Sequence, residues 1–305
     1  MDAGTKNNTL QRIEALPGIL AVHPEEPLRD HTTFRIGGPA EFFVTVGTAE
    51  GADALIRFAG GCGMPLRFLG FGSNVLAPDE GLRGITAVLA GDFQEIRMDQ
   101  ASGVVKAGAG VSLANLAAAT AKEGLAGLAF AGGIPGSVGG GILMNAGAYG
   151  GEMKDVLREA EVLIDGTVRT MTAEELQLSY RHSVLMERPG LILSGTFVLQ
   201  KEDPEKILAE IRELNHRRQE KQPLNYPSAG SAFKRPEGYF AAALIEECGL
   251  KGKQVGGAAV SEKHSGFIVN LGGATAADVR ELIRVVQETV AEQKGVRLEP
   301  EIRIL

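Results

Sequence analysis

The most restrictive feature of this sequence is residues 131–153, AGGIPGSVGGGILMNAGAYGGEM, with nine glycines among 23 residues. Glycine destabilises helices, so a strong isolated helix is not expected here. The segment also contains Ile, Val, Leu and Met, which excludes a solvated linker. Backbone amides in such a wall could approach a large flat ligand and its pyrophosphate. The alternative is close packing of one chain segment on another.

A second glycine-rich stretch is LGFGSNVLA, residues 69–77, directly after a predicted strand. Its glycines permit tight backbone geometry, and its exposed amides and serine hydroxyl suit phosphate oxygens. It is not the dinucleotide fingerprint, because residue 75 is Val rather than the third Gly. It is not a P-loop either, because no Gly-Lys-Ser/Thr occurs. Read alone, the stretch is equally compatible with an ordinary tight turn.

Composition restricts the class of protein. A chain of 305 residues with 44% hydrophobic and 23% charged residues is long enough for two or three globular domains. Its net charge of −7 argues against general binding of nucleic acid or acidic membranes. The polar N-terminus has no apolar signal core, and no apolar run is long enough to span a membrane. We expect a cytoplasmic protein.

The chain has two cysteines, Cys62 and Cys248, without Cys-x-x-Cys spacing, which predicts free thiols in a reducing compartment. Its five histidines are scattered, and no His-Glu-x-x-His motif occurs, so no metal centre is predicted.

Periodicity predicts a mixed α+β fold with a boundary near residue 200. Ser112, Asp203 and Thr275 are predicted helix N-caps, and Thr172 with Glu175 forms a capping box for a short helix. Strands are predicted at 40–46, 66–69, 85–89, 191–199, 266–270 and 297–305, with a hairpin over 161–171 on an Asp-Gly turn. Helices are predicted early in residues 1–30, from near 48, and at 113–123, 204–220, 240–248 and from 276.

Residues 225–236, NYPSAGSAFKRP, contain a serine among small residues, followed by two cations. Tyr-Pro and Ala-Gly exclude a regular helix or a central strand, so a shaped loop is expected. Small residues let a ligand approach the backbone, and the cations indicate that this ligand is an anion.

Nine motifs, in this order, resemble the UDP-N-acetylenolpyruvoylglucosamine reductase (MurB) family, and together they are highly specific. They are HTTFRIGG (31–38), GFGSN (70–74), GGIPGSVGG (132–140), MNAGAYG (144–150), SYRHS (179–183), SAGSAFKRP (228–236), GLKG (249–252), VSEKHSGFIVN (260–270) and LEPEIRI (298–304).

The resemblance implies a two-subdomain FAD-binding fold of the vanillyl-alcohol-oxidase/PCMH type, followed by a C-terminal α+β substrate domain. The implied division is 1–90 and 91–200 for the FAD subdomains and 201–305 for the substrate domain, with the final strand free to return to the flavin domain. Residues implied to bind FAD are Arg35, Ile36, Gly70, Phe71, Gly72, Ser73, Asn74, Gly133, Ile134, Pro135, Gly136, Ser137, Gly139 and Gly140.

The implied reaction has two halves. NADPH reduces FAD, and the reduced flavin passes a hydride to the enolpyruvyl double bond of a UDP-sugar. The nicotinamide and the substrate use one pocket in turn. The product, UDP-N-acetylmuramate, is a peptidoglycan precursor.

Three residues match the family's catalytic positions. Ser231 matches the proton donor, Glu301 the carboxyl group that stabilises or protonates the enolic intermediate, and Arg181 the guanidinium that binds the substrate carboxylate. Each also has a plain alternative: a serine that bonds the backbone, a surface carboxylate and a surface ion pair. Glu299 is the competing acid, and the register about Pro300 favours Glu301.

The resemblance also implies a substrate-binding set. Lys221, Lys234 and Arg235 are candidates for the diphosphate, and His264 and Tyr180 for other substrate contacts; solvated charge is the alternative for the cations. The short spacing from Ser231 to Glu301 resembles the branch without an extra tyrosine segment, and Arg235 stands where the longer branch carries an amide.

Two rival functions fit parts of the pattern: a flavin oxidase of the same fold, and a non-catalytic module that binds UDP-sugars. The oxidase needs no substrate proton donor such as Ser231, and the binding module predicts no turnover. A monomer is expected, with an oligomer left open.

Overall fold

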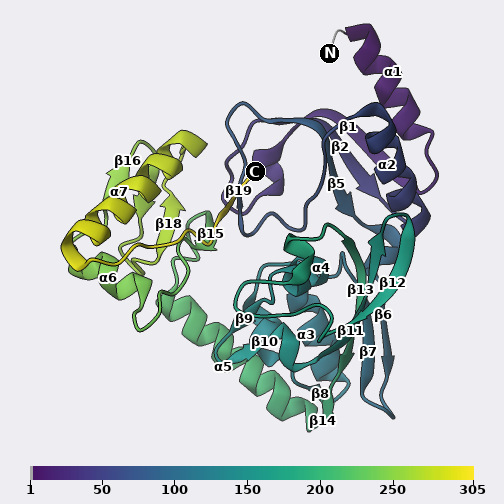
Figure 1. Ribbon diagram of the computed structural model, residues 1–305. Coiled ribbons are helices and arrows are strands. Elements are labelled where there is room, and N and C mark those ends of the chain that lie inside the picture. The colour runs from purple at the N-terminus through teal and green to yellow at the C-terminus, as the bar shows by residue number, and fades with distance from the viewer. Residues whose placement is uncertain (1–2) are drawn as a thin grey trace. The chain divides into compact units, whose positions relative to one another are not determined.

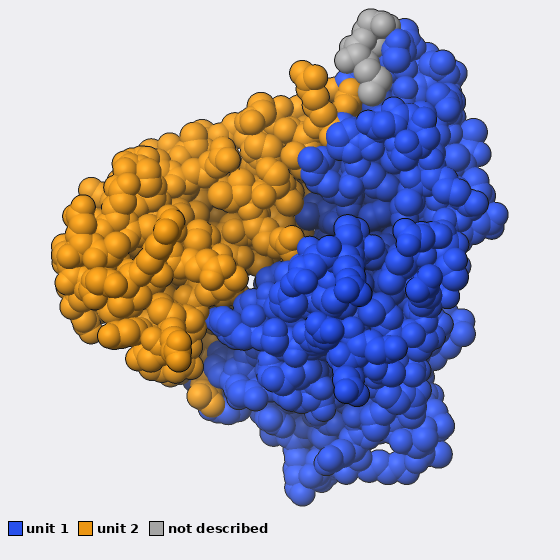
Figure 2. All heavy atoms as spheres, in the orientation of Figure 1, with its two compact units in different colours: residues 1–24, 42–70, 84–216 blue, residues 25–41, 71–83, 217–305 orange. Residues whose placement is uncertain are grey.

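The computed structural model describes residues 3–305 (Figure 1). The chain forms two compact units, and each is assembled from separated segments. Unit 1 comprises Met1–Pro24, Phe42–Gly70 and Gly84–His216, and unit 2 comprises Glu25–Glu41, Phe71–Arg83 and Arg217–Leu305 (blue and orange in Figure 2). The mixed α+β prediction is confirmed. These units are defined by the compactness of the chain and not by what each part binds. The three-part functional division therefore stays a prediction.

A four-stranded sheet of order β1-β2-β5-β3 opens the chain. The strands are β1 (Ile19–Pro27), β2 (Pro39–Val46), β3 (Leu66–Phe68) and β5 (Leu82–Leu89), and the helices in this part of the chain are α1 (Ala3–Glu14) and α2 (Ala49–Cys62). Thr48 accepts the N–H of Gly51 and begins α2, as the sequence predicted. The helix packs on the sheet because Leu55 joins Val44 and Ile85 in one fully buried cluster.

The second sheet of unit 1 is antiparallel throughout, with order β12-β11-β13-β7-β6. The predicted hairpin is confirmed, because Asp165 and Gly166 take positive φ angles of 49° and 72° in its turn. Helices α3 and α4 contribute Leu116 and Ile142 to its buried cluster. The elements are β6 (Ile96–Asp99), β7 (Val104–Gly108), α3 (Leu113–Lys122), β8 (Leu125–Ala126), α4 (Val138–Leu143), β9 (Gly147–Ala148), β10 (Gly151–Glu152), β11 (Leu157–Ile164), β12 (Thr167–Thr172), β13 (Leu191–Val198) and β14 (Gln200–Lys201).

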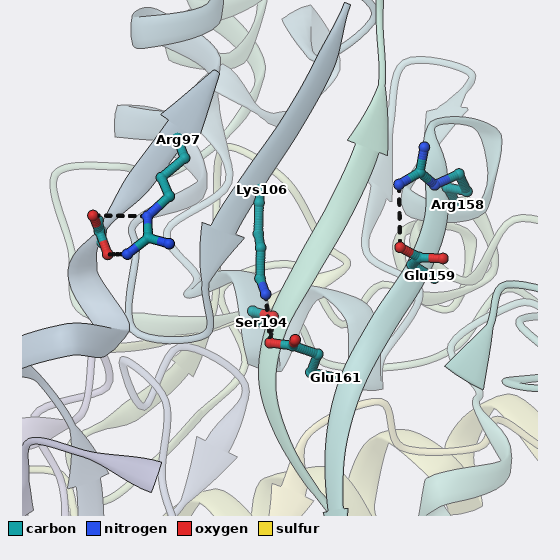
Figure 3. A network of polar contacts seen from close by, with 7 residues as sticks. Arg97, Lys106, Arg158, Glu159, Glu161 and Ser194 are labelled. Atoms are coloured by element: carbon teal, nitrogen blue, oxygen red, sulfur yellow. Dashed lines mark hydrogen bonds and ion pairs between the residues drawn. The ribbon is translucent and has the colours of Figure 1, made fainter. Parts of the chain in front are cut away.

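Polar side chains link neighbouring strands of this sheet (Figure 3). Glu161 of β11 accepts from Ser194 of β13 and Lys106 of β7, each at 2.7 Å. Partial burial raises the pKa of the Glu161 carboxyl, but the hydrogen bonds from Lys106 and Ser194 outweigh it and lower that pKa. Half-exposed pairs of this kind contribute about 1 kcal/mol or less, so the network supports the sheet and does not mark a reactive centre.

Unit 2 is built on a four-stranded sheet of order β15-β18-β17-β16 with two helices. The predicted N-cap of α7 is confirmed at Thr275, and Asp278 completes a capping box with it. Helix α5 (Pro204–Lys221) precedes the sheet, and its bounds agree with the predicted 204–220. The other elements are β4 (Val75–Leu76), β15 (Ser228–Ser231), α6 (Ala241–Glu247), β16 (Gln254–Val255), β17 (Ala258–Val260), β18 (Phe267–Asn270), α7 (Ala276–Lys294) and β19 (Arg303–Ile304).

Early segments of the chain complete the core of unit 2. Phe34, Ile36 and Leu76 are at most 2% exposed and lie in one cluster with Leu282 and Ile268. β4 pairs in parallel with β19, so residues about 230 positions apart along the chain form a two-stranded ribbon. Helix α7 is also held by the early chain, because Asp79 accepts the N–H groups of Ala276 and Ala277 at 2.7 and 3.1 Å.

Three local predictions are wrong. The Thr172–Glu175 hydrogen bonds both form, but residues 173–177 are a turn rather than a helix. Residues 297–305 contain only the two-residue strand β19. Residues 228–231 are an edge strand with a register shift, not a loop, because their backbone pairs with β18 on one side only.

Replacing Asp79 with Ala should destabilise the protein by about 1 kcal/mol, because the first amides of α7 lose their carboxylate acceptor. Urea unfolding followed by circular dichroism measures this. The neighbouring exposed Glu80 is the control, and Glu80→Ala should change stability by less than about 0.5 kcal/mol. Equal effects of the two substitutions would show that the contact with α7 contributes nothing.

Candidate active site

The two glycine-rich segments meet within unit 1. A Cβ placed on Gly70 would lie 2.8 Å from Ser137 Oγ, so the glycine permits a side chain of the second segment to approach the first. Ser137 is 4% exposed and caps α4 by accepting the N–H of Gly140 at 3.2 Å. The two segments therefore approach each other closely at this point.

The loop Gly70–Asn74 offers backbone donors. Over residues 3–305, none of these five amide groups donates to a protein acceptor. Gly72 takes a φ of 61°, and a Cβ there would lie 2.2 Å from His31 O. Gly72 O in turn accepts the N–H of Thr33 at 3.2 Å. The loop is thus fixed from one side while its amides remain available to an anion.

Gly139 of the 133–140 segment serves chain packing, which was the alternative interpretation. A Cβ on Gly139 would lie 2.9 Å from that of Ala109, and Gly139 N–H donates to Ala109 O at 2.9 Å. The remaining stretch, Gly133, Ile134, Pro135 and Gly136, is partly or fully exposed and precedes α4. Packing therefore accounts for Gly139, and the exposed stretch before α4 stays a candidate for contact with a ligand.

The segment with Arg35 and Ile36 lies in unit 2. Thr32 Oγ1 donates to Ile36 O at 3.1 Å, and this turn holds Arg35 at a φ of 54° with its side chain exposed. Ile36 is 2% exposed and belongs to the core, so only its backbone could reach a ligand.

Ser231 and Glu301 are neighbours in unit 2. Glu301 N–H donates to the carbonyl of Ala232, the residue after Ser231, at 2.9 Å. Asn74 Nδ2 donates to Glu301 O at 3.3 Å, and Arg303 N–H donates to Asn74 O at 3.0 Å. A chain of hydrogen bonds therefore links the glycine loop, Glu301 and the Ser231 strand.

Ser231 is partly exposed, and within the described part of the chain its hydroxyl has no hydrogen-bond partner. The plain alternative, a serine that bonds the backbone, is not what the fold contains. Glu299 is engaged elsewhere, since its carboxylate accepts from Lys234 Nζ at 2.5 Å.

The substrate-side candidates of unit 2 differ in their surroundings. Arg235 lies over the ring of Phe240, 4.0 Å from its centroid, and both are exposed. Lys221 is exposed at the end of α5. His264 Nδ1 accepts the N–H of Gly266 at 3.1 Å, and burial lowers the pKa of its imidazole. His264 is consequently neutral near pH 7 with its proton on Nε2, where it can donate to a ligand.

Arg181 and Tyr180 form the tip of a tight turn in unit 1. Ser179 and His182 exchange two backbone hydrogen bonds of 3.1 Å, and Arg181 takes a φ of 55°. The guanidinium lies 5.2 Å from the Tyr180 ring centroid, and its Nη2 donates to Gly147 O at 3.4 Å. Local structure therefore contributes to holding Arg181, through the closed turn and the carbonyl of Gly147.

The sequence pattern did not single out Asn145, which is fully buried and connects the Arg181 turn to the second glycine-rich segment. Its signal was present as a polar residue inside a run of glycine and apolar residues. Over residues 3–305, no cluster of three His, Cys, Asp or Glu side chains could hold a metal, and no helix combines the length and apolar character needed to cross a bilayer.

The residues present fit FAD. Available amides in the Gly70–Asn74 loop and the close approach of Gly70 to Ser137 suit a pyrophosphate, and the exposed Arg35 adds positive charge within unit 2. In unit 2, a free hydroxyl at Ser231 beside Glu301 suits proton transfer.

Comparisons with known proteins give the same result. Residues 40–172 match a family model described as an FAD binding domain. Residues 222–305 match a model described as the C-terminal domain of UDP-N-acetylenolpyruvoylglucosamine reductase. These matches, with the structural comparison below, confirm the predicted fold class and the predicted family.

Curated relatives and a solved structure extend over nearly the whole chain. UDP-N-acetylenolpyruvoylglucosamine reductase from Agathobacter rectalis is 50% identical over 303 residues, covering 96% of each chain. That from Lachnoclostridium phytofermentans is 47% identical, covering 98% of this chain and 97% of its own. The crystal structure of the Thermus caldophilus enzyme (MurB) has a TM-score of 0.80 at 40% identity, covering 94% of this chain and 98% of its own.

Replacing Gly72 with Ala should weaken FAD binding by about tenfold or more, because a left-handed residue with a Cβ costs about 1–2 kcal/mol and this Cβ meets His31 O. Fluorescence titration of the apoprotein with FAD measures the affinity. Gly60 is the matched control, because a Cβ there meets nothing within 4 Å, and Gly60→Ala in α2 should retain FAD. Unchanged affinity in Gly72→Ala would refute the role of the loop.

Proposed function

The chain belongs to the UDP-N-acetylenolpyruvoylglucosamine reductase family, and from that premise we propose that Ser231, Glu301 and Arg181 carry its chemistry. It is an NADPH-dependent flavoprotein oxidoreductase that reduces UDP-N-acetylglucosamine enolpyruvate to UDP-N-acetylmuramate for peptidoglycan synthesis. The observation that best supports the residue assignment is the hydrogen-bonded link from Asn74 through Glu301 to the strand of Ser231.

FAD would be held by the amides of Gly70–Asn74, by the segment 133–140 and by the Arg35 turn. When bound, this cofactor takes hydride from NADPH and supplies it to the substrate. The protein must bind and orient the substrate, stabilise the charge that develops on it and deliver a proton.

Ser231 Oγ would donate that proton to the substrate carbon next to the one that receives hydride. A serine hydroxyl is a very weak acid, so it needs accurate placement and a neighbouring group that carries or returns the proton. Its hydroxyl is not used by the protein, and its strand is fixed by the Ala232–Glu301 hydrogen bond. A protonated Glu301 would donate a hydrogen bond to the enolate-like oxygen and act as that neighbour.

Arg181 would bind the carboxylate that is conjugated to the double bond. A guanidinium can form two parallel hydrogen bonds with a carboxylate, and its charge draws electron density toward that group as hydride arrives. Display at the tip of a tight turn suits this role, since the turn fixes the direction of the side chain.

We propose that the diphosphate is bound by Lys221, Lys234 and Arg235, with His264 and Tyr180 as further substrate contacts. Lys234 would exchange Glu299 for phosphate, and this exchange is inexpensive because an exposed ion pair contributes about 1 kcal/mol or less. His264 would donate through Nε2.

We further propose that the three-part functional division 1–90, 91–200 and 201–305 holds, and that the enzyme acts as a cytoplasmic monomer. The two thiols, Cys62 and Cys248, are free, which suits a reducing compartment. Neither rival function is favoured by the family matches.

An anaerobic absorbance titration tests the function. The flavin band of the purified enzyme should bleach with one equivalent of NADPH and return when UDP-N-acetylglucosamine enolpyruvate is added. Return only on admission of air would favour the oxidase. Binding of the UDP-sugar without any change in the reduced flavin would favour a module that binds without turnover.

Replacing Ser231 with Ala should leave reduction by NADPH within about twofold and slow reoxidation by the enolpyruvyl substrate by about 10²–10⁴-fold, the usual contribution of a positioned proton donor. Stopped-flow absorbance separates the two halves. Ser228 of the same strand provides the control, since Ser228→Ala should alter neither rate. Equal losses in both halves would contradict the assignment.

A further inference from the structure

We infer that Asn145 is a positioning residue that fixes the turn carrying Arg181. The inference rests on the carboxylate-binding role proposed for Arg181. Asn145 is 0% exposed and has a φ of 43°, and it lies directly after α4 in the second glycine-rich segment.

The backbone hydrogen bonds around Asn145 explain why this residue is left-handed, but they do not explain why it is an asparagine. Asn145 N–H donates to Ile142 O at 3.1 Å and Ala146 N–H donates to Gly141 O at 2.8 Å, which is the Schellman motif that ends a helix. Glycine is the usual residue at the left-handed position of this motif. In a segment with nine glycines among 23 residues, an asparagine here indicates that its side chain is required.

The Asn145 side chain makes three hydrogen bonds in two directions. Oδ1 accepts the N–H of Lys154 at 2.9 Å, and Nδ2 donates to Glu152 Oε2 at 2.7 Å. These two bonds hold the chain that follows α4. The second hydrogen of Nδ2 goes to Ser179 O at 3.1 Å, the carbonyl at the base of the Tyr180–Arg181 turn. Both donors of the amide are thereby used in a buried setting, where loss of a partner is costly.

Asn145 also fixes the strand that accepts a hydrogen bond from Arg181. Arg181 Nη2 donates to the carbonyl of Gly147 in β9 at 3.4 Å, and β9 pairs with β10 through Gly147 and Glu152. Asn145 therefore holds the backbone of the turn and, through Glu152, the strand that contacts the guanidinium. A shift of the guanidinium by about 1 Å is enough to misalign a bound substrate and to slow its reaction strongly.

Two substitutions separate this role from helix termination. Asn145→Gly preserves the left-handed backbone and the Schellman motif but removes all three side-chain hydrogen bonds. Asn145→Asp also tolerates this backbone and keeps the acceptor for Lys154, but it places an oxygen opposite the Glu152 carboxylate and Ser179 O. Both should lose the positioning effect, and Asn145→Asp should lose at least as much as Asn145→Gly.

Amide hydrogen exchange on the FAD-bound enzyme without substrate gives the first test, and it needs no turnover. In Asn145→Gly, a peptide covering residues 178–183 should exchange faster by about tenfold, because the base of the turn loses its buried donor. A peptide covering α3, which is distant in sequence, serves as the internal reference. Unchanged exchange across the turn would overturn the inference.

Substrate binding to the oxidised enzyme, followed by perturbation of the flavin absorbance, gives the second test. Asn145→Gly and Arg181→Ala should each raise Kd by about 10- to 100-fold, as expected for loss of a hydrogen bond to a charged group. In the Arg181→Ala background, Asn145→Gly should change Kd by less than about twofold, because it acts through the arginine. Additive effects would show that Asn145 does not act through Arg181.

The control is Asn115, an exposed asparagine on α3 whose side chain makes no hydrogen bond within residues 3–305. Asn115→Ala should leave exchange and Kd unchanged. If Arg181→Ala weakens binding but Asn145→Gly does not, positioning by Asn145 is refuted and the role of Arg181 stands. If Arg181→Ala leaves Kd unchanged, the proposed role of Arg181 is refuted, and the inference fails with it.

Discussion

The pairing of β4 with β19 is the constraint on which the arrangement of unit 2 depends. It joins Val75 to Arg303, and the Asn74 side chain reinforces it by donating to Glu301 O across 227 positions of sequence. Closing so long a loop has a large entropic cost, but that cost grows only slowly with length and the buried core of Phe34, Leu76 and Leu282 offsets it. The consequence is that the Gly70–Asn74 loop lies beside Glu301 and close to the Ser231 strand, which come from the far end of the chain.

The parts of the fold that were predictable are those encoded within a few residues. Caps at Ser112 and Thr275 and the Asp165-Gly166 turn satisfy their hydrogen bonds locally, so sequence spacing reveals them. The Thr172–Glu175 box shows the limit of such reasoning, because both of its hydrogen bonds form without a helix behind them. Unit 2 could not be predicted as a body, since its core combines three separate segments and no local pattern records that Asp79 will hold α7.

Candidate site residues could be predicted from the sequence where they lie in a recognisable motif. They could not be predicted where their role depends on contacts that form only in the folded chain. The segment with Ser231 and the glycine loop were singled out by their motifs, but spacing could not show that a Cβ on Gly72 would meet His31 O or that one on Gly139 would meet Ala109. Asn145 was missed for a related reason. Its partners are a backbone amide, a carbonyl and one carboxylate, 7 to 34 positions away, and only the folded chain brings them to one amide group.

Positive φ angles mark the turns that carry Asn145 and Arg181 as positions of backbone strain. Outside glycine, positive φ angles are costly for L-residues, and a bulky residue in this region needs an explanation from its surroundings. Arg35, Asn145, Tyr149 and Arg181 all take such angles, although asparagine or glycine would adopt them at lower cost in three of the four cases. At Asn145 the surroundings are explicit, because both amide hydrogens and the oxygen of the side chain are hydrogen-bonded. At Arg181 the turn is closed by its neighbours and the guanidinium donates to Gly147 O, so the strain accompanies a side chain that its surroundings help to hold. Backbone strain of this kind often accompanies a preorganised site. A residue that tolerates the turn more easily, such as glycine, would relieve the strain but would lose the side chain.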